Sequence, residues 1–148
     1  AGGDTLTVVE NPYYPEGMFG SIEAGMTAVS TDWFFVVPGD LPHLTPEVFQ
    51  KVAAAASSGK DGSNPDRPLA VVPFFRETRG HPVLVHSSLI PRLLEQPRDA
   101  GPMRNLLARY PVLALHLDDA AITVDIDTDH DYREAVDRAG RERETDSL

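Results

Sequence analysis

Apolar and polar positions follow two periodicities along the chain, and together they predict an α/β fold. The stretches Trp33–Val37, Leu69–Phe75 and Val112–Leu117 are rich in apolar residues, and Trp33–Val37 is a continuous run of aromatic and β-branched residues. Strands that are buried on both faces of a parallel sheet have this composition. Shorter apolar stretches predict further strands at residues 6–10, 81–86 and 122–127. Because helical periodicity separates these runs, we expect a sheet of mostly parallel strands with helices packed on it.

Helices are predicted in the segments between these strands. One opens at Thr45, which suits the N-cap position and precedes a proline in the first turn. The last opens at Thr128, and Asp131, three residues later, completes the spacing of a capping box. The other predicted helices follow the glycine-containing loop that ends at Ser21, follow Ser87 or Ser88, and span residues 103–109.

Length and composition indicate one ordinary folded domain. The chain has 148 residues, and 41% of them are hydrophobic, enough for a core. We assign residues 1–136 to this domain and expect the highly charged segment 137–148 to fray. No apolar run has the length that a membrane-spanning helix requires, so we expect no membrane association.

Charge narrows the classes of partner. The formal net charge is −10, and duplex DNA and anionic membranes both require basic patches, so we expect no nucleic-acid partner. The absence of cysteine excludes disulfides, thiolate metal sites and a cysteine nucleophile. No signal peptide is visible at the N-terminus of this sequence, and a cytoplasmic location is expected.

Asp40 is the first candidate site residue. It follows the apolar run Trp33–Val37 after Pro38 and Gly39, which end the predicted strand. Ligands of open α/β sheets bind beyond the carboxyl ends of strands, so Asp40 could hold Mg²⁺. Aspartate is also common in turns and at helix N-caps, and this segment alone does not separate the two interpretations.

A second acidic group lies near the C-terminus, at Asp125, Asp127, Asp129 and Asp131. Its spacing resembles the start of an EF-hand loop, but His130 replaces the glycine and Val136 replaces the bidentate glutamate of that motif. A Mg²⁺ site remains, because this ion needs only one or two protein carboxylates. Asp129 and Asp131 are better explained as acids in the first turn of a helix.

Several motifs occur in the order found in the MobA-like nucleotidyltransferases, and within that family the chain most resembles the molybdenum cofactor cytidylyltransferases. Each motif alone has low specificity, but several in order, over most of residues 8–136, are specific. They are Asn11-Pro12, Gly17-Met18, Ser21–Met26, Val37–Pro42, Arg79–Val83 and Asp125–Tyr132.

The resemblance implies a fold and an activity. It implies a Rossmann-like three-layer α/β/α sandwich of the nucleotide-diphospho-sugar transferase type. It also implies transfer of a nucleoside monophosphate from an NTP (CTP or GTP, CTP in the nearest subfamily) to a phosphorylated acceptor, with release of pyrophosphate. The acceptor implied is the molybdopterin cofactor, the implied metal is Mg²⁺, and a molybdenum hydroxylase is an implied partner.

The resemblance also implies site residues. Asp40 and Asp127 occupy the metal-binding and catalytic positions, and Gly17 and Ser21 lie where related enzymes hold the nucleotide base. Gly80 and His81 lie on the acceptor side, although a histidine before proline in a strand-edge turn is more often structural. The loop before Ser21 could equally be an ordinary connection between a strand and a helix.

The chain departs from the family at its N-terminal signature. Nothing in it matches the glycine-rich Leu-Ala-Ala-Gly loop whose arginine and lysine balance phosphate charge, so we expect a fold that lacks the first βα unit or units. Asp129-His130 replaces the usual Pro-Glu pair. Two hypotheses follow: a C-terminal portion of a nucleotidyltransferase, or an inactive module that binds a cofactor or a partner through the acceptor half. We expect the 148-residue chain alone not to turn over NTP.

Overall fold

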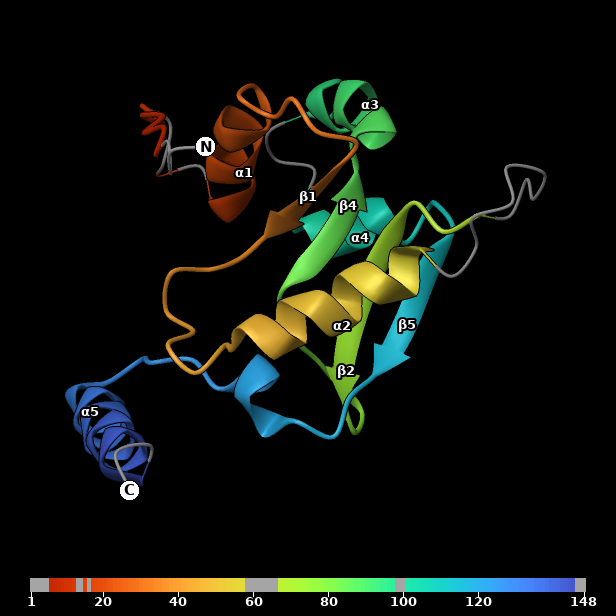
Figure 1. Ribbon diagram of the computed structural model, residues 1–148. Coiled ribbons are helices and arrows are strands. Elements are labelled where there is room, and N and C mark those ends of the chain that lie inside the picture. Colours follow the sequence, from red (N-terminus) through yellow and green to blue (C-terminus); the bar gives the residue numbers. More distant parts are fainter. Residues whose placement is uncertain (1–5, 13–14, 16, 58–66, 98–100, 146–148) are drawn as a thin grey trace.

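The computed structural model describes residues 6–12, 15, 17–57, 67–97 and 101–145, with side chains described up to residue 137 (Figure 1). The helices are α1 (Met18–Met26), α2 (Pro46–Ser57), η2 (Ser87–Leu89), α3 (Ile90–Leu94), α4 (Met103–Leu107), η3 (Ala120–Thr123) and α5 (Asp129–Thr145). The strands are β1 (Trp33–Val36), β2 (Ala70–Phe75), β3 (Thr78–Arg79), β4 (Val83–His86) and β5 (Val112–His116). No described helix is long and apolar enough to cross a bilayer.

The strands form one open mixed sheet, in the order β1-β4-β2-β3 with β5 on the other side of β2. The expectation of mostly parallel strands is wrong. Within the described chain β1·β4, β2·β3 and β2·β4 pair antiparallel, and only β2·β5 is parallel. The reason is local. The chain reverses at a tight turn between β2 and β3, and β4 then returns between β1 and β2, antiparallel to both.

Helices cover both faces of the sheet, which confirms the predicted α/β fold class. Adjacent residues of a strand point to opposite faces, and the core divides accordingly. Ala70 and Val85, which are register partners, pack with α1, α3 and α4. Val71 and Leu84, the next pair, pack with α2 and Ile122 on the other face. Figure 1 shows α2 crossing in front of the strands, with α4 behind them.

Three strand predictions need correction. Residues 6–10 form no strand in the structure, and Leu6 and Val8 are 88% and 85% exposed. The stretch 122–127 is not a strand either: Ile122 lies in η3, and an irregular segment follows. All residues of β1 are only half-buried, because the described chain pairs with this strand on one side alone. Both faces of β1 nevertheless contact the core, Phe34 and Val36 on one face and Trp33 and Phe35 on the other, so the expectation of burial on both faces is met only in part.

The predicted helix ends are confirmed in part. Pro46 opens α2, and the capping box of α5 forms: the Asp131 carboxylate accepts from the Thr128 backbone N–H at 2.8 Å, and Thr128 Oγ1 accepts from the Asp131 N–H at 3.2 Å. The cap before α3 differs, because the His86 ring, rather than a serine, accepts from the Ser88 N–H.

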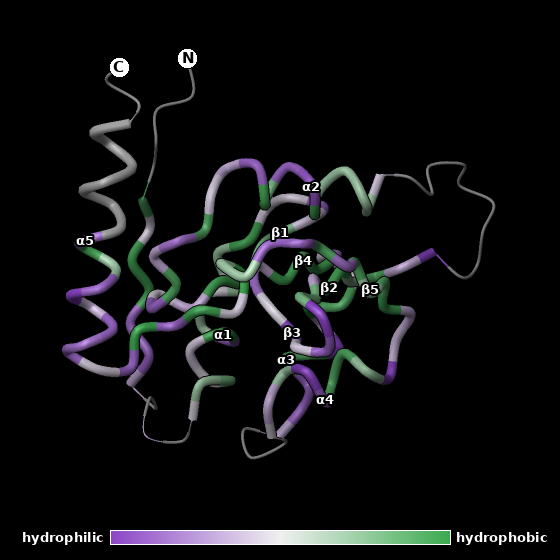
Figure 2. Tube along the Cα trace, turned by 90° about the horizontal axis from the view of Figure 1, so that it is seen from below, coloured by the Kyte–Doolittle hydropathy of each residue, from purple (hydrophilic) through white to green (hydrophobic). Residues whose placement is uncertain are grey.

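Two helix boundaries also differ from the predictions. α1 begins at Met18, before the predicted start at Ser21. α5 continues to Thr145, into the segment that we expected to fray, and its first turns are mainly hydrophilic (Figure 2). The boundary of the domain at residue 136 stays a prediction.

Candidate active site

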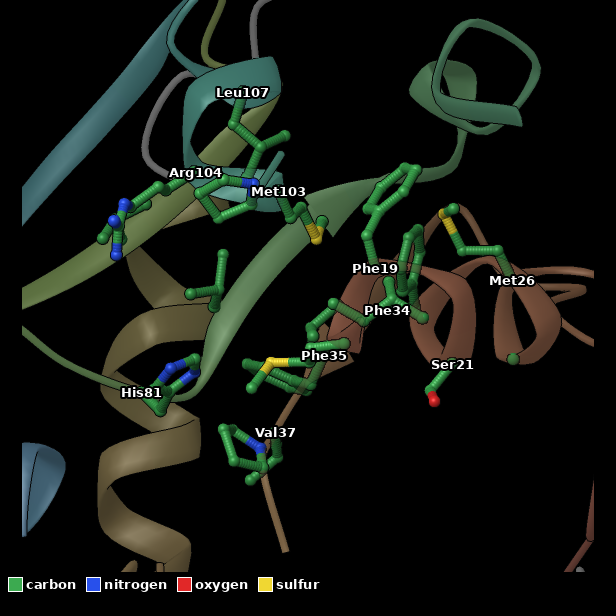
Figure 3. A pocket seen from close by; sticks show the side chains of 18 of the residues that line it. Phe19, Ser21, Met26, Phe34, Phe35, Val37, His81, Met103, Arg104 and Leu107 are labelled. Carbon is green, nitrogen blue, oxygen red and sulfur yellow. The ribbon is translucent and has the colours of Figure 1, made fainter. Parts of the chain in front are cut away.

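A cleft of about 870 Å³ lies beyond the carboxyl end of β1, between α1, β4 and α4. Figure 3 shows its side chains: His81 and Arg104 lie on one side, and Phe19, Met26 and Phe34 lie on the other. Four of the residues predicted from the sequence line this cleft, namely Ser21, Asp40, Gly80 and His81. The fold therefore brings together residues that are up to sixty positions apart along the chain.

Asp40 is placed by the strand before it and by a distant segment. β1 ends at Val36, and Pro38 and Gly39 lead to Asp40, which is exposed at the cleft. The Asp40 carbonyl accepts a hydrogen bond from the Ile126 backbone N–H at 3.0 Å. This bond fixes the backbone of the loop and leaves the carboxylate available to a ligand.

His81 is half-buried in the wall of the cleft. Burial lowers the pKa of its imidazole below the ordinary value, although a hydrogen bond with the Val36 backbone and the charge of Asp40 act in the other direction. Its Nδ1 is buried and has no hydrogen-bond partner among the described residues. The ring is consequently favoured in its neutral form, beside the carboxylate of Asp40.

Gly80 is required by close packing rather than by backbone conformation. A Cβ at this position would lie 2.6 Å from Ile122 Cγ1 and 2.7 Å from the Ile122 carbonyl oxygen. Its N–H donates to the Pro73 carbonyl at 2.8 Å, and the next N–H, of His81, donates to the Ile122 carbonyl at 2.8 Å. Gly80 therefore has a structural reason to be glycine in addition to its place in the cleft wall.

Ser21 and Gly17 lie at the start of α1. Ser21 lines the cleft, and its Oγ accepts a hydrogen bond from the Asn11 side chain at 3.1 Å. Gly17 is the N-cap of α1 with φ of 117°, a conformation that favours glycine, and it is not among the residues that line the cleft. Its neighbour Met18 does line the cleft, and a role for Gly17 in holding the nucleotide base stays a prediction.

Asp127 is also outside the cleft lining, but its segment adjoins Asp40 through the Ile126 hydrogen bond. Asp125 lines a separate pocket of about 70 Å³ beside α5. Asp131 serves the helix cap, and hydrogen bonds from Thr128 hold the pKa of its carboxyl below the ordinary value. Among the described residues no group of three His, Cys, Asp or Glu side chains could hold a metal ion.

Several cleft residues were not among the predicted site residues. Arg79 and Arg104 both line the cleft and are exposed, and Arg79 lies over the Phe74 ring at 5.7 Å. Arg79 directly precedes the predicted pair Gly80-His81, so its positive charge beside that motif is the sequence feature that could have identified it as a cleft residue. All three methionines of the chain, Met18, Met26 and Met103, line the cleft, and no local pattern links their positions.

The cleft therefore has two chemically different ends. His81 and Arg104 supply hydrogen-bonding groups and charge on one side, and Phe19, Met26 and Phe34 supply an apolar surface on the other (Figure 3). Asp40 and Arg79 also line the cleft and add charge to it. Guanidinium groups pair well with phosphate oxygens, and methionine and phenylalanine pack on flat rings. Such an arrangement suits a ligand in which a ring system is joined to phosphate groups.

Comparison with known proteins defines the class to which this fold and cleft belong. The profile described as "MobA-like NTP transferase domain" matches residues 1–115. The chain belongs to this family, as the order of its motifs predicted. Residues 116–148, which include Asp127, lie beyond the match.

Individual known proteins are similar to this chain in sequence or in fold. The molybdenum cofactor cytidylyltransferase of Escherichia coli strain K12 is 29% identical over 138 residues, which cover 93% of this chain and 66% of that protein. Among solved structures, Rv0371c of Mycobacterium tuberculosis H37Rv has a TM-score of 0.63 at 20% identity, covering 80% of this chain and 59% of that one. Molybdopterin-guanine dinucleotide biosynthesis protein A of Archaeoglobus fulgidus has a TM-score of 0.61 at 18% identity, covering 84% and 64%. The chain thus spans about two thirds, or somewhat less, of the length of these relatives.

Proposed function

We propose that this chain is part of a nucleotidyltransferase that moves a nucleoside monophosphate from an NTP to a molybdopterin-type acceptor and releases pyrophosphate. Family membership supports transferase chemistry, and the cytidylyltransferase relative supports CTP as the donor. The observation that supports the proposal best is the cleft, which Asp40 lines together with two arginines and an apolar surface. Nucleotidyl transfer depends mainly on positioning and on neutralising phosphate charge, and these groups can do both.

A divalent cation, Mg²⁺ in our proposal, would be held by Asp40 with Asp127. The donor set fits: Mg²⁺ uses one or two carboxylates and otherwise water and phosphate oxygens. The two aspartates lie on adjacent segments that the Ile126–Asp40 hydrogen bond joins. A structure of Rv0371c is described as a complex with manganese, which supports a divalent ion in this family. When bound, the ion would neutralise charge on the triphosphate.

The two ends of the cleft suggest where each substrate lies. Ser21, on α1 with the apolar side chains, would contact the nucleotide base, and Gly17 would shape the start of that helix. Gly80 and His81 would face the acceptor, with Arg79 and Arg104 near its phosphate. A molybdenum hydroxylase as the recipient of the product stays a prediction.

The first test compares two aspartates in the natural gene product that contains this sequence. Asp40→Asn keeps the shape of the side chain and removes the charge, so pyrophosphate release should fall roughly 10²-fold or more. Asp129→Asn is the matched control, because Asp129 lies in the first turn of α5 and does not line the cleft. We expect Asp127→Asn to resemble Asp40→Asn. Release is measured against Mg²⁺ concentration.

The outcomes separate the two functional hypotheses. Equal losses for Asp40→Asn and Asp129→Asn would show that Asp40 is not the metal ligand. Binding of Mg²⁺–CTP without any pyrophosphate release would favour the alternative, an inactive module that binds cofactor or partner. Tighter binding of Mg²⁺–GTP than of Mg²⁺–CTP would contradict the proposed donor.

A further inference from the structure

The segment 120–127, which we call the C-terminal clasp, contacts two loops that line the cleft. At one end the Ile122 carbonyl accepts from the His81 N–H at 2.8 Å. At the other end the Ile126 N–H donates to the Asp40 carbonyl at 3.0 Å. One short stretch of backbone thus links the loop that carries Asp40 to the loop that carries His81.

The Ile122 end of the clasp is held firmly. Ile122 is 0% exposed and packs in the core with α2. Gly80 lies so close to its carbonyl and side chain that even a methyl group would clash. Within η3, the Asp119 carboxylate accepts from the Ala121 N–H at 3.0 Å and Thr123 Oγ1 donates to the Ala120 carbonyl at 2.9 Å. A buried anchor with satisfied polar groups can transmit position to the residues attached to it.

We propose that Ile122 and Ile126 are positioning residues, which fix the Asp40 loop relative to His81. Each acts through its backbone, and neither would touch a substrate. The proposal rests on the proposed function for the role of Asp40, but the holding of the loop is a property of the chain itself. The clasp lies beyond residues 1–115, the part that matches the family profile, so this role comes from the structure alone.

The test separates the backbone hydrogen bond from the side chain at one position. Ile126→Pro removes the N–H that Asp40 accepts, whereas Ile126→Ala keeps it and shortens the side chain. The difference between the two variants reports the hydrogen bond together with the fixed φ of proline, and a backbone ester at Ile126, which removes the N–H alone, separates the two effects. Two readouts are compared in the natural gene product that contains this sequence: the amide order parameters of Gly39 and Asp40, and the affinity for Mn²⁺ measured by electron paramagnetic resonance.

We expect Ile126→Pro to lower the order parameters of Gly39 and Asp40 from about 0.85 toward about 0.6, and Ile126→Ala to stay near the higher value. Loss of an outer-shell partner weakens metal binding roughly 10–100-fold, so Mn²⁺ should bind at least about tenfold more weakly to the proline variant than to the alanine variant. Circular dichroism identifies variants that retain the fold, and a proline variant that unfolds is replaced by Ile126 carrying a backbone ester in place of its amide.

The results distinguish the clasp from the metal site. Equal order parameters and equal Mn²⁺ affinities in the two variants would overturn the positioning role. Failure of the unsubstituted chain to bind Mn²⁺ would instead count against the metal part of the proposed function. In that case a loss of order in the proline variant alone would still support the clasp as the element that holds the Asp40 loop.

Discussion

His81 combines burial with a position in the cleft, and this gives its protonation a direct effect on stability. Because burial lowers its pKa in the folded state, the unfolded chain takes up a proton more readily on acidification. The stabilising contribution is therefore complete above the unfolded pKa, about 6.5, and is lost as the pH falls toward the lowered folded value.

We predict that the free energy of unfolding falls more steeply with decreasing pH in the native sequence than in His81→Gln. The free energy of unfolding, measured by urea titration between about pH 7.5 and about pH 5, should fall more in the protein with histidine. His130→Gln is the control, because His130 is exposed on α5. Identical pH profiles for the native protein and His81→Gln would show that the buried imidazole does not contribute.

Gly80 illustrates how packing can require a glycine. In Gly80→Ala the added methyl group would meet the carbonyl oxygen of Ile122, which is backbone and cannot rotate away. Overpacking of this kind costs about 1–3 kcal/mol of stability, measurable by urea unfolding. Gly25→Ala is the control: no atom lies within 4 Å of its new Cβ, and alanine in a helix gains up to about 1 kcal/mol. An unchanged free energy of unfolding in Gly80→Ala would mean that the clasp can move away from the added methyl group.

At the scale of elements, the capping box of α5 makes a separate prediction. Thr128→Ala removes Oγ1, which accepts from the Asp131 N–H and donates to its carboxylate at 2.7 Å. Loss of such a cap should speed amide exchange in the first turns of α5 roughly fivefold, without changing exchange in β2. Thr123→Ala, which removes a hydroxyl outside α5, is the control. Exchange that is unchanged in α5 would show that tertiary contacts hold the helix end.

Element identity was largely predictable from the sequence, whereas strand direction was not. The stretches that became β1, β2 and β5 were recognised because apolar residues cluster there, with aromatic and β-branched residues in β1 and β2. Direction depends on which strands meet after the chain reverses at β3, and that pairing is long-range information that no local pattern contains. The same limit applies to the stretch 122–127: its apolar composition resembles a strand, but Ile122 is buried because it packs against Gly80 and α2.

The candidate site was predictable where motifs were local. Asp40, Gly80 and His81 were placed through short motifs, and all line the cleft. Arg104 was not among the predicted site residues, because nothing in its own segment shows that α4 borders the same space. Asp127 stays a prediction, since its neighbour Ile126, rather than its own side chain, is what the structure connects to Asp40.

At the scale of the whole molecule, β1 is an edge of the sheet within the described chain. The His86 N–H donates to the Leu69 carbonyl, on the side of β2. The backbone N–H and C=O groups of its register partner Trp33, and of Phe35 two residues later, therefore point away from β4. No charged side chain lies between Trp33 and Gly39 to protect this edge. An unprotected apolar edge favours pairing between copies, against the general repulsion of a net charge of −10.

We therefore predict that the 148-residue chain self-associates. Light scattering should give a mass that rises with concentration, and Val37→Lys, which adds a charge beside this edge, should reduce it. Val124→Lys is the matched control, because Val124 is similarly exposed, 37% against 40% for Val37, and lies in the clasp. A compact monomer at every concentration would contradict the prediction.

The three methionines that line the cleft can serve as natural spectroscopic probes of ligand binding. Every methionine methyl group in the chain is at this one site, so isotope labelling of methionine alone would give a spectrum that contains only cleft signals. Met18 is 70% exposed and Met26 is 2% exposed, so the mouth and the floor of the cleft would be observed separately. A ligand that enters only part of the way would be distinguished from one that fills the cleft, without any substitution in the protein.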